Sequence, residues 1–396
     1  MTHTTYQALK DRENQYVMPT YNRFPIALDH GKGSTLWDVE GKKYIDLTSG
    51  IGVNCLGYDH EKLIEAMTAQ AHKLMHVSNL FTTAPMIDVA ETLCKATGMS
   101  KVFFANSGAE ANEGAIKLAR KYSFDKYGKG RAKIITLVNS FHGRTITTLQ
   151  ATGQDVFHNY FFPFTEGFDY AQAGDLEDLK SKIDDSTCAV MMELIQGEGG
   201  VLPQDPAYVQ AVEKLCREKD LLLLIDEVQT GIGRTGALFC FQNYGIHPDV
   251  VSMAKALGGG VPVGGVMAAK TCDTVLGPGT HATTFGATPL VCACAKVVLE
   301  EVNQPAFLQA VREKGDYIQE KIRSWQSPKI KAVRGQGLMI GVIVEEGKHS
   351  AYAKEIIEKG ALVLTAGKDA IRLLPPLNIS YEEIDEAMAA MQAVLA

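Results

Sequence analysis

The stretch Leu221-Leu-Leu-Leu-Ile-Asp226 is followed by Asp249-Val-Val-Ser-Met-Ala-Lys-Ala-Leu-Gly-Gly-Gly260, and these two segments indicate the class of fold. Five consecutive apolar residues before Asp226 indicate a strand that is buried on both faces, as in a parallel sheet covered by helices. The second segment carries another apolar run, Val250 to Met253, just before Lys255 and a glycine tract. We therefore expect a carboxylate and a lysine at the ends of two strands of one sheet.

Short apolar segments alternate with amphipathic segments from about residue 101 to about residue 270. This alternation predicts an α/β fold with a mostly parallel sheet and helices on both of its faces. The expected strands are 102–105, 134–138, 189–192, 221–225, 250–253 and 264–268, and the clearest helices are 109–122 and 206–218.

The pattern changes after about residue 289. Long helices are expected first, then short strands, and finally a helix that ends the chain. The expected helices are 290–302, 306–325 and 380–396, and the expected strands are 338–344, 362–364 and 371–374. Together with two short strands at 36–40 and 43–46, they predict a second, smaller α+β domain.

Composition excludes several classes of protein. The 396 residues carry a net charge of −7, which gives no basic surface for nucleic acid. The longest apolar runs are shorter than a membrane span, and residues 1–10 lack the apolar core of a signal peptide, so we expect a cytoplasmic protein. Eight cysteines are scattered without a C-x-x-C pair, and Cys292-Ala-Cys294 has a spacing that aims its side chains apart on a helix. We expect no metal site.

Asp226 and Lys255 together predict a cofactor. A lysine amine can hold an aldehyde as a Schiff base, and a buried carboxylate can keep a pyridine nitrogen protonated, which makes the ring an electron sink. Pyridoxal 5'-phosphate is the cofactor that needs both groups. The alternative for Asp226 is a structural ion pair with Arg234.

Residues 106–113, Asn-Ser-Gly-Ala-Glu-Ala-Asn-Glu, follow an expected strand and open an expected helix. Free amides at a helix N-terminus bind anions, so Ser107, Gly108 and Ala109 are candidates for a phosphate site. The alternative is a helix cap in which Ser107 is the N-cap and Glu110 closes a capping box.

Two further segments follow expected strands. Phe141-His-Gly-Arg144 offers an aromatic ring that can stack on a flat heteroaromatic ring, and an arginine that can bind a carboxylate. Glu193-Leu-Ile-Gln-Gly-Glu-Gly-Gly200 places acidic residues and glycines where ligands bind in such sheets. Core packing and a solvated loop, respectively, are the alternatives.

The motifs taken together resemble those of the class III pyridoxal phosphate aminotransferases of fold type I. The resemblance rests on D-E-V-Q-T-G-I-G-R-T-G (226–236), on the run from Asp249 to Gly260, on N-S-G-A-E-A-N-E and on F-H-G-R-T. It covers essentially the whole chain. It implies a large cofactor-binding domain over 61–288, a small domain over 289–396, and an N-terminal segment, 1–60, that contributes to the small domain.

The resemblance also implies a role for each candidate residue. Lys255 and Asp226 would be the catalytic pair, and Thr284 would come from the neighbouring subunit of a homodimer. The other cofactor-binding candidates are Ser107, Gly108, Ala109, Phe141, Glu227, Val228 and Gln229. The substrate-binding candidates are Arg144, Thr283, Glu193, Glu198 and Arg372, with Glu198 covering Arg372 whenever an ω-amino substrate is bound.

Within the family, S-G-I-G-V-N (49–54) and H-A-T-T-F-G (281–286) resemble the branch that acts on N2-acetylornithine in arginine biosynthesis. That resemblance implies transfer of the δ-amino group to 2-oxoglutarate. Alternative amino donors are ornithine, succinylornithine, N-succinyl-diaminopimelate and 4-aminobutyrate. The branch that acts on free ornithine carries a tyrosine near Gly50-Ile51, which this chain lacks. A racemase or mutase on the same fold, or a binding module without activity, are the rivals from other classes.

Overall fold

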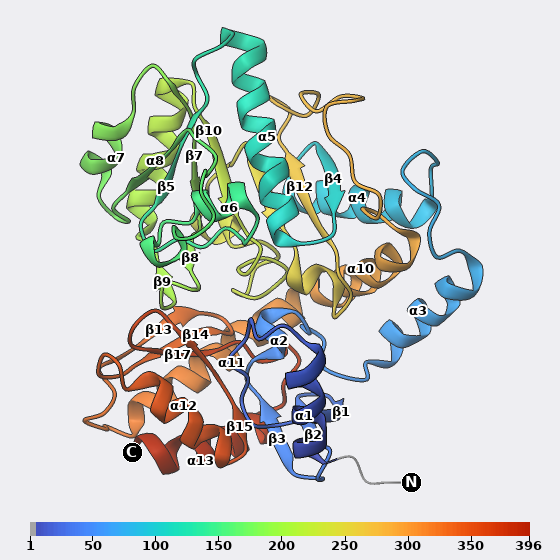
Figure 1. Ribbon diagram of the computed structural model, residues 1–396, viewed down its shortest axis with the longest axis vertical. Coiled ribbons are helices and arrows are strands. Elements are labelled where there is room, and N and C mark those ends of the chain that lie inside the picture. Colours follow the sequence, from blue (N-terminus) through green and yellow to red (C-terminus); the bar gives the residue numbers. More distant parts are fainter. Residues whose placement is uncertain (1–4) are drawn as a thin grey trace.

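The computed structural model describes residues 5–396, and the first four residues of the N-terminal stretch lie outside them. The chain forms an upper part around a seven-stranded sheet and a lower part around two four-stranded sheets (Figure 1). The first described residues and the C-terminus lie in the lower part. Within the described residues, the structure contains no helix with the length and apolar character that crossing a bilayer requires.

The seven-stranded sheet has the strand order β4-β12-β11-β10-β7-β5-β6. All neighbouring pairs are parallel except those of β12, which runs antiparallel to both β11 and β4. The strands are β4 (Lys101–Ala105), β5 (Lys133–Leu137), β6 (Phe168–Ala171), β7 (Thr187–Met192), β10 (Leu222–Asp226), β11 (Val250–Met253) and β12 (Gly264–Ala268). The expected mostly parallel sheet is confirmed, and β6 is a strand that the sequence pattern did not indicate.

Helices cover both faces of this sheet, and the alternation of side chains along the strands divides the core in two. Ile134 and Leu224 pack with the small residues of α5 (Gly108–Tyr127) on one face. Ile135 and Ile225 pack on the opposite face with α8 (Pro206–Lys219). Strands buried on both faces must be apolar at every position, which explains the leucine run before Asp226. The smaller helices of this part are α6 (Ile146–Ala151), α7 (Leu176–Lys182) and α9 (Phe241–Tyr244).

The lower part contains a sheet of order β13-β14-β17-β16. Its strands are β13 (Ala332–Gln336), β14 (Met339–Ile343), β16 (Leu364–Ala366) and β17 (Ala370–Leu373). The helices α11 (Pro305–Ser324), α12 (His349–Glu358) and α13 (Tyr381–Leu395) pack around it. This sheet carries Arg372 on β17.

The N-terminal strands join the C-terminal region in the second small sheet, of order β1-β2-β3-β15. Its strands are β1 (Leu28–Lys32), β2 (Thr35–Asp38), β3 (Lys43–Asp46) and β15 (Ala361–Leu362). The expected strand at 362–364 is split, because the chain leaves one sheet after β15 and enters the other at β16. Buried Val363 is the residue at which the chain changes sheets.

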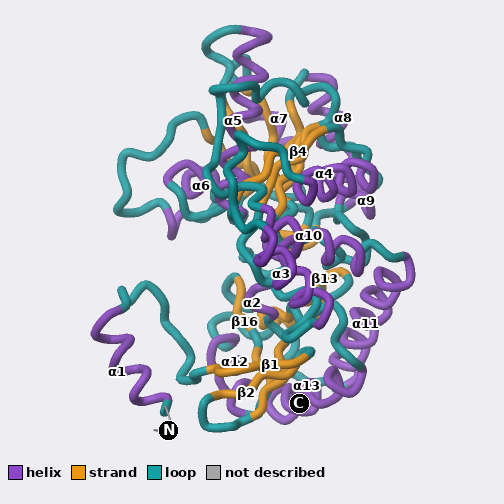
Figure 2. The backbone as a smooth tube through the Cα atoms, turned by 90° about the vertical axis from the view of Figure 1, so that its right-hand side faces the viewer, coloured by secondary structure: helices purple, strands orange, loops and turns teal. Residues whose placement is uncertain are grey.

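Helix α10 (Pro289–Val302) packs against α3 (Glu61–Lys73) and α4 (Ala84–Thr97), so it belongs spatially with the upper part although it follows the expected domain boundary. Helix α1 (Tyr6–Tyr16) has no buried residue and projects from the rest of the chain (Figure 2). All eight cysteines are free thiols. Burial raises the pKa of Cys292 to about 12, so this thiol is a poor nucleophile and metal ligand at neutral pH.

Candidate active site

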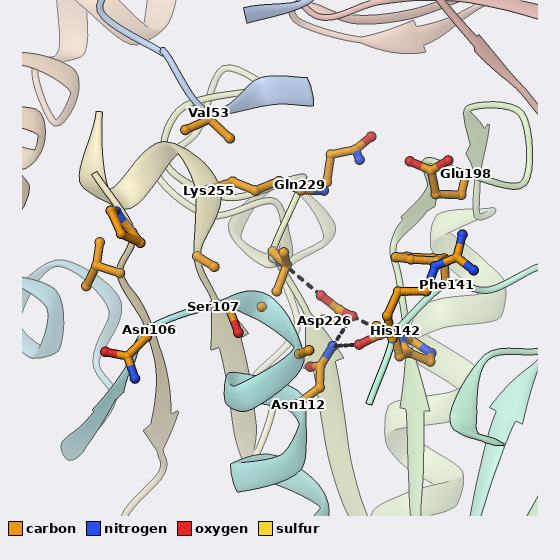
Figure 3. A pocket seen from close by; sticks show the side chains of 18 of the residues that line it. Val53, Asn106, Ser107, Asn112, Phe141, His142, Glu198, Asp226, Gln229 and Lys255 are labelled. Carbon is orange, nitrogen blue, oxygen red and sulfur yellow. Dashed lines mark hydrogen bonds and ion pairs between the residues drawn. The ribbon is translucent and has the colours of Figure 1, made fainter. Parts of the chain in front are cut away.

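Polar side chains gather at the carboxyl edge of the seven-stranded sheet. The chain leaves β4 at Asn106, β7 at Glu193 and β11 just before Lys255, while Asp226 is the last residue of β10. These residues line one cavity of about 620 Å³ (Figure 3). Ligands of open α/β sheets bind at this edge, so the strand order itself brings the predicted residues together.

Asp226 is buried at the centre of this edge. Asn112 Nδ2 donates to its Oδ2 at 2.7 Å, and His142 Nδ1 lies 2.7 Å from the same oxygen. The Val228 amide donates to Oδ1 at 3.0 Å. A buried carboxylate needs donors of this kind to remain ionised. The alternative pairing with Arg234 does not occur, because that side chain donates to backbone carbonyl groups.

Asn112 and His142 are contacts of Asp226 that the sequence did not single out, although both lie inside the motifs quoted above. A signal for Asn112 was available, because it follows Gly108 by four residues and so lies on the same face of α5. Asn112 Nδ2 also donates to the His142 carbonyl at 2.7 Å. The three residues therefore form one connected network below the cavity (Figure 3).

Lys255 lines the cavity and has unusual backbone geometry. Its φ of 45° lies in the left-handed region, which is uncommon for residues other than glycine. Such strain is frequent at functional sites, where the surrounding structure holds it. Desolvation lowers the pKa of the Lys255 ammonium, which favours the neutral, nucleophilic amine.

The N-terminus of α5 forms another wall of the cavity. Ser107 is its N-cap, and its hydroxyl oxygen accepts a hydrogen bond from the Glu110 amide at 3.2 Å. The expected capping box does not form, because the Glu110 carboxylate accepts from the backbone amide of Asn106 instead. A Cβ on Gly108 would meet Val228 Cγ1 at 2.6 Å, so glycine is required where the helix approaches the strand that ends in Asp226. The helix terminus suits a phosphate.

Phe141 and Arg144 also line the cavity. The Arg144 guanidinium lies 4.1 Å from the centre of the Phe157 ring and 5.4 Å from the centre of the Phe141 ring. Stacking on aromatic faces holds the guanidinium without consuming its N–H donors. Arg144 is exposed at the rim and remains able to bind a carboxylate.

The Glu193 side chain is buried, and its carboxylate accepts hydrogen bonds from two backbone amides. Its Oε1 accepts from the Phe141 amide at 2.9 Å, and its Oε2 accepts from the Gly197 amide at 3.1 Å. Burial raises the pKa of Glu193, and the nearby Asp226 carboxylate adds to this effect. Both carboxylate oxygens are thus engaged in holding two segments of the cavity wall.

Glu198 and Arg372 form an ion pair of 2.8 Å between the two parts of the molecule. Arg372 is 2% exposed and also donates to Gln229 Oε1 at 3.2 Å. Gln229 belongs to the segment after β10, so this contact joins the cofactor-side residues to β17 of the small sheet. The Gln229 side chain occupies the space beside Gly197, where a Cβ would meet its Oε1 at 2.2 Å, so a larger residue at 197 would displace this side chain.

Four predicted site residues do not line the cavity. Arg372 lies behind the lining residues Glu198 and Gln229, with which it pairs. Glu227 points away from it, and its carboxylate accepts from the Thr230 hydroxyl and from the amides of Cys240 and Phe241. Thr283 and Thr284 lie on a loop beyond the cavity, where Asn106 Nδ2 donates to the Thr283 hydroxyl at 3.0 Å.

Two residues of the N-terminal segment line the cavity without having been predicted. Val53 lies close to Lys255 in the view of Figure 3, and Tyr21 belongs to the chain that follows α1. Each comes from far upstream of the cofactor-side motifs. Only tertiary structure brings them to the site.

A family model described as aminotransferase class-III matches residues 16–395. The acetylornithine aminotransferase of Haemophilus ducreyi is 49% identical over 393 residues, which cover 99% of each chain. The ornithine aminotransferase structure from Toxoplasma gondii ME49 superposes with a TM-score of 0.94 at 32% identity and covers 99% of this chain and 95% of that chain. The N-acetylornithine aminotransferase structure from Stenotrophomonas maltophilia K279a gives 0.84 at 34% identity, with 97% of both chains covered.

Glu227 provides a test of stability against pH. Burial raises its pKa from 4.5 to about 7, so the folded chain keeps this proton at a higher pH than the unfolded chain. The contribution of Glu227 to the free energy of unfolding therefore falls as the pH rises from 4.5 to 7. Glu227→Gln removes the titrating group. The wild type's free energy of unfolding minus that of the variant should fall by up to roughly 3 kcal/mol over this range.

Urea unfolding of both proteins at a series of pH values measures this difference. A difference that stays constant with pH would show that the three donors around Glu227 keep it ionised in the folded chain.

Proposed function

Because the chain belongs to the class-III aminotransferases, which are pyridoxal phosphate-dependent transaminases of fold type I, we propose that it acts on N2-acetyl-L-ornithine. The δ-amino group passes to 2-oxoglutarate, and the products are N-acetyl-L-glutamate 5-semialdehyde and L-glutamate. The Glu198–Arg372 ion pair beside Lys255 is the observation that carries the proposal, because it suits a site that must accept two different amino donors. We place this reaction in arginine biosynthesis, in the cytoplasm.

The residues of the cavity fit pyridoxal phosphate. When bound, the cofactor supplies an electron sink for charge that develops at the carbon bearing the transferred nitrogen. Lys255 Nζ would hold the cofactor and move the proton, and the Asp226 carboxylate would pair with the ring nitrogen. Asn112 and His142 hold that carboxylate in place through contacts to its Oδ2. The α5 N-terminus with Ser107, Gly108 and Ala109 would hold the phosphate, and Phe141, which also lines the cavity, would stack on the ring.

Arg372 and Glu198 distinguish the two amino donors. Glutamate reacts at its α-amine, so its α-carboxylate requires a free Arg372. Acetylornithine reacts at its terminal amine, and Glu198 then neutralises Arg372. Glu198 also lines a second cavity of about 640 Å³ whose wall carries Arg334 and Lys368. The wall also carries Asp369, and this cavity gives the carboxylate space when it leaves Arg372.

Arg144 binds the opposite end of the substrate. It lines the same cavity as Lys255, and we propose that it binds the α-carboxylate of acetylornithine while the δ-amine points at Lys255. A guanidinium stacked on Phe157 is pre-organised for such a bidentate contact. Gln229 would contact the 3'-oxygen of the cofactor, and its Oε1 accepts from Arg372 Nη1 at 3.2 Å.

A homodimer explains an exposed apolar patch formed by Met75, Leu80, Phe81 and Phe285. Leu80 is 87%, Phe81 66% and Phe285 61% exposed. Asn79 Nδ2 donates to the Gly286 carbonyl at 2.8 Å, so the two segments of the patch form one surface. Apolar surface of this kind is typical of subunit interfaces. Thr283 and Thr284 lie on this loop, and we propose that they complete the neighbouring subunit's site.

Single-turnover reactions test the amino donor. The holoenzyme is mixed with acetylornithine, succinylornithine, ornithine or 4-aminobutyrate, and the change in cofactor absorbance gives a rate for each. We expect the rate with acetylornithine to exceed that with ornithine by about 10²-fold, because Arg144 and its surroundings must accept an acylated α-nitrogen. Lys255→Ala, folded by circular dichroism, is the inactive control. A higher rate with ornithine would overturn the choice of donor.

Arg372→Ala tests whether Arg372 and Arg144 bind the carboxylates of different amino donors. A desolvated bidentate contact is worth roughly 2–5 kcal/mol, so the glutamate half-reaction should slow by about 10²-fold or more. The acetylornithine half-reaction should slow much less, because its carboxylate is bound by Arg144. Glu198→Ala should show the reverse order, with Glu198→Gln between it and the wild type. If both variants slowed both half-reactions equally, Glu198 and Arg372 would form only a structural ion pair and would not distinguish the two amino donors.

Phe285→Glu tests the homodimer. A charge in the apolar patch should convert the sedimenting species from dimer to monomer and lower the turnover rate by about 10²-fold, because an interface aromatic and the partner's threonines are both lost. Phe124→Glu is the matched control, since Phe124 is also exposed but lies on the outer part of α5. A Phe285→Glu variant that sediments and turns over as the wild type does would exclude this interface.

A further inference from the structure

Arg234 is a buried cation that the proposed function leaves unused. It is 1% exposed, and none of the ion pairs formed among residues 5–396 includes it. Burial lowers the pKa of Arg234 to about 10, so it remains charged at neutral pH. A buried charge that forms no ion pair is costly, and the charge of Arg234 is stabilised by its hydrogen bonds and by the nearby Asp46 carboxylate.

Those hydrogen bonds reach the small sheet. Arg234 Nη1 donates to the Leu338 carbonyl at 3.0 Å and to the Pro375 carbonyl at 2.5 Å. The Leu338 amide donates back to the Arg234 carbonyl at 3.0 Å. Leu338 immediately precedes β14, and Pro375 follows the end of β17. One guanidinium thus holds the start of β14 and the end of β17.

These two strand ends lie beside Arg372. The strands β14 and β17 pair antiparallel, with Gly341 opposite Arg372 and Ile340 opposite Leu373. The ladder therefore continues directly from Arg372 to the carbonyl groups that Arg234 binds. Ser49 supports the same place, because its hydroxyl donates to the Leu374 carbonyl at 2.6 Å and lies 3.5 Å from Arg234 Nη2.

The segment that carries Arg234 also carries the cofactor-side residues. It begins at Asp226, and Gln229 within it accepts from Arg372 Nη1 at 3.2 Å. The segment therefore contacts the Arg372 side chain through Gln229. Through Arg234 it contacts the end of β17, the strand that carries Arg372. The backbone at Arg234 packs directly against the backbone at Gly337, since a Cβ on Gly337 would meet the Arg234 carbonyl oxygen at 2.7 Å.

We propose that Arg234 is a positioning residue that sets the place of Arg372 relative to the cofactor and so determines the specificity for glutamate and 2-oxoglutarate. The inference rests on the proposed function, in which Arg372 binds the α-carboxylate of glutamate. A shift of about 1 Å in a substrate-binding group costs roughly 10²-fold in rate. Arg234 prevents that shift because it joins two strand ends of the small sheet to the segment that begins at Asp226.

A purely structural role predicts a different result. If Arg234 only stabilises the fold, its loss lowers the thermal midpoint and slows both half-reactions by the same factor. If it positions Arg372, the glutamate half-reaction suffers selectively. The ratio of the two half-reactions therefore separates the two roles.

The experiment uses the holoenzymes of Arg234→Met and Arg234→Lys. Methionine removes the charge and all donors, and lysine keeps the charge but cannot reproduce the fixed geometry of the guanidinium. Each half-reaction is measured in single turnovers, and the binding of glutarate, an unreactive dicarboxylate, is measured by calorimetry. We expect the glutamate half-reaction to slow, and glutarate affinity to fall, by about tenfold or more, while the acetylornithine half-reaction slows less than about threefold.

Arg131→Met is the matched control. Arg131 likewise donates to backbone carbonyls, those of Thr187, Lys219 and Asp220, but at the opposite, amino edge of the large sheet. Its loss should leave the ratio of the half-reactions unchanged. An equal slowing of both half-reactions in Arg234→Met, or an equal change of the ratio in Arg131→Met, would overturn the proposal.

Ser49→Ala covers the case in which the Arg234 variants do not fold. It removes the hydroxyl that holds the Leu374 carbonyl and should change the ratio in the same direction by a smaller factor, and an unchanged ratio would count against the proposal. Failure of the proposed function is visible separately, because the wild type itself would then not react with acetylornithine.

Discussion

The buried carboxylate of Asp226 constrains the arrangement of the whole site. It stands at the end of a strand that is buried on both faces, so its charge must be satisfied by protein groups. Asn112 of α5, His142 after β5 and the Val228 amide supply the donors. Each of these comes from a different element of the upper part, and the strand order must bring all of them to one edge of the sheet.

The second constraint is the junction between the two parts of the molecule. The amine and the cofactor-side carboxylate belong to the large sheet, whereas Arg372 belongs to a sheet built from the last third of the chain. The segment after β10 bridges them through Gln229 and Arg234, and Glu198 meets Arg372 from the loop between β8 (Ile195–Gln196) and β9 (Leu202–Pro203). A site assembled from two sheets can accept substrates of different length, provided that the junction holds each charged group in place.

Residue type does not decide the role of an acidic side chain in this site. Glu193, Glu198 and Glu227 all follow strands near the cavity, and burial raises the pKa of both Glu193 and Glu227. Glu193 accepts from two backbone amides of the cavity wall, and Glu227 accepts from a neighbouring loop. Only Glu198 pairs with a cation at the cavity. The difference arises from where each carboxylate points after its strand.

The sequence by itself determined six of the seven strands of the large sheet, the helices α5, α8 and α10, the presence of a lysine and a carboxylate at strand ends, and the helix N-terminus at Ser107. These features are local, because apolar runs, glycine positions and capping residues act within a few residues of one another. Tertiary structure alone decided which side chains of the site form hydrogen bonds with one another. Asn112 and Asp226 are 114 positions apart, and Gln229 and Arg372 are 143 positions apart, so no local pattern links them. It also decided that β15 and β16 join different sheets, that Glu227 points away from the cavity, and that Arg234 binds carbonyl groups rather than Asp226, because each depends on which segments the fold packs together.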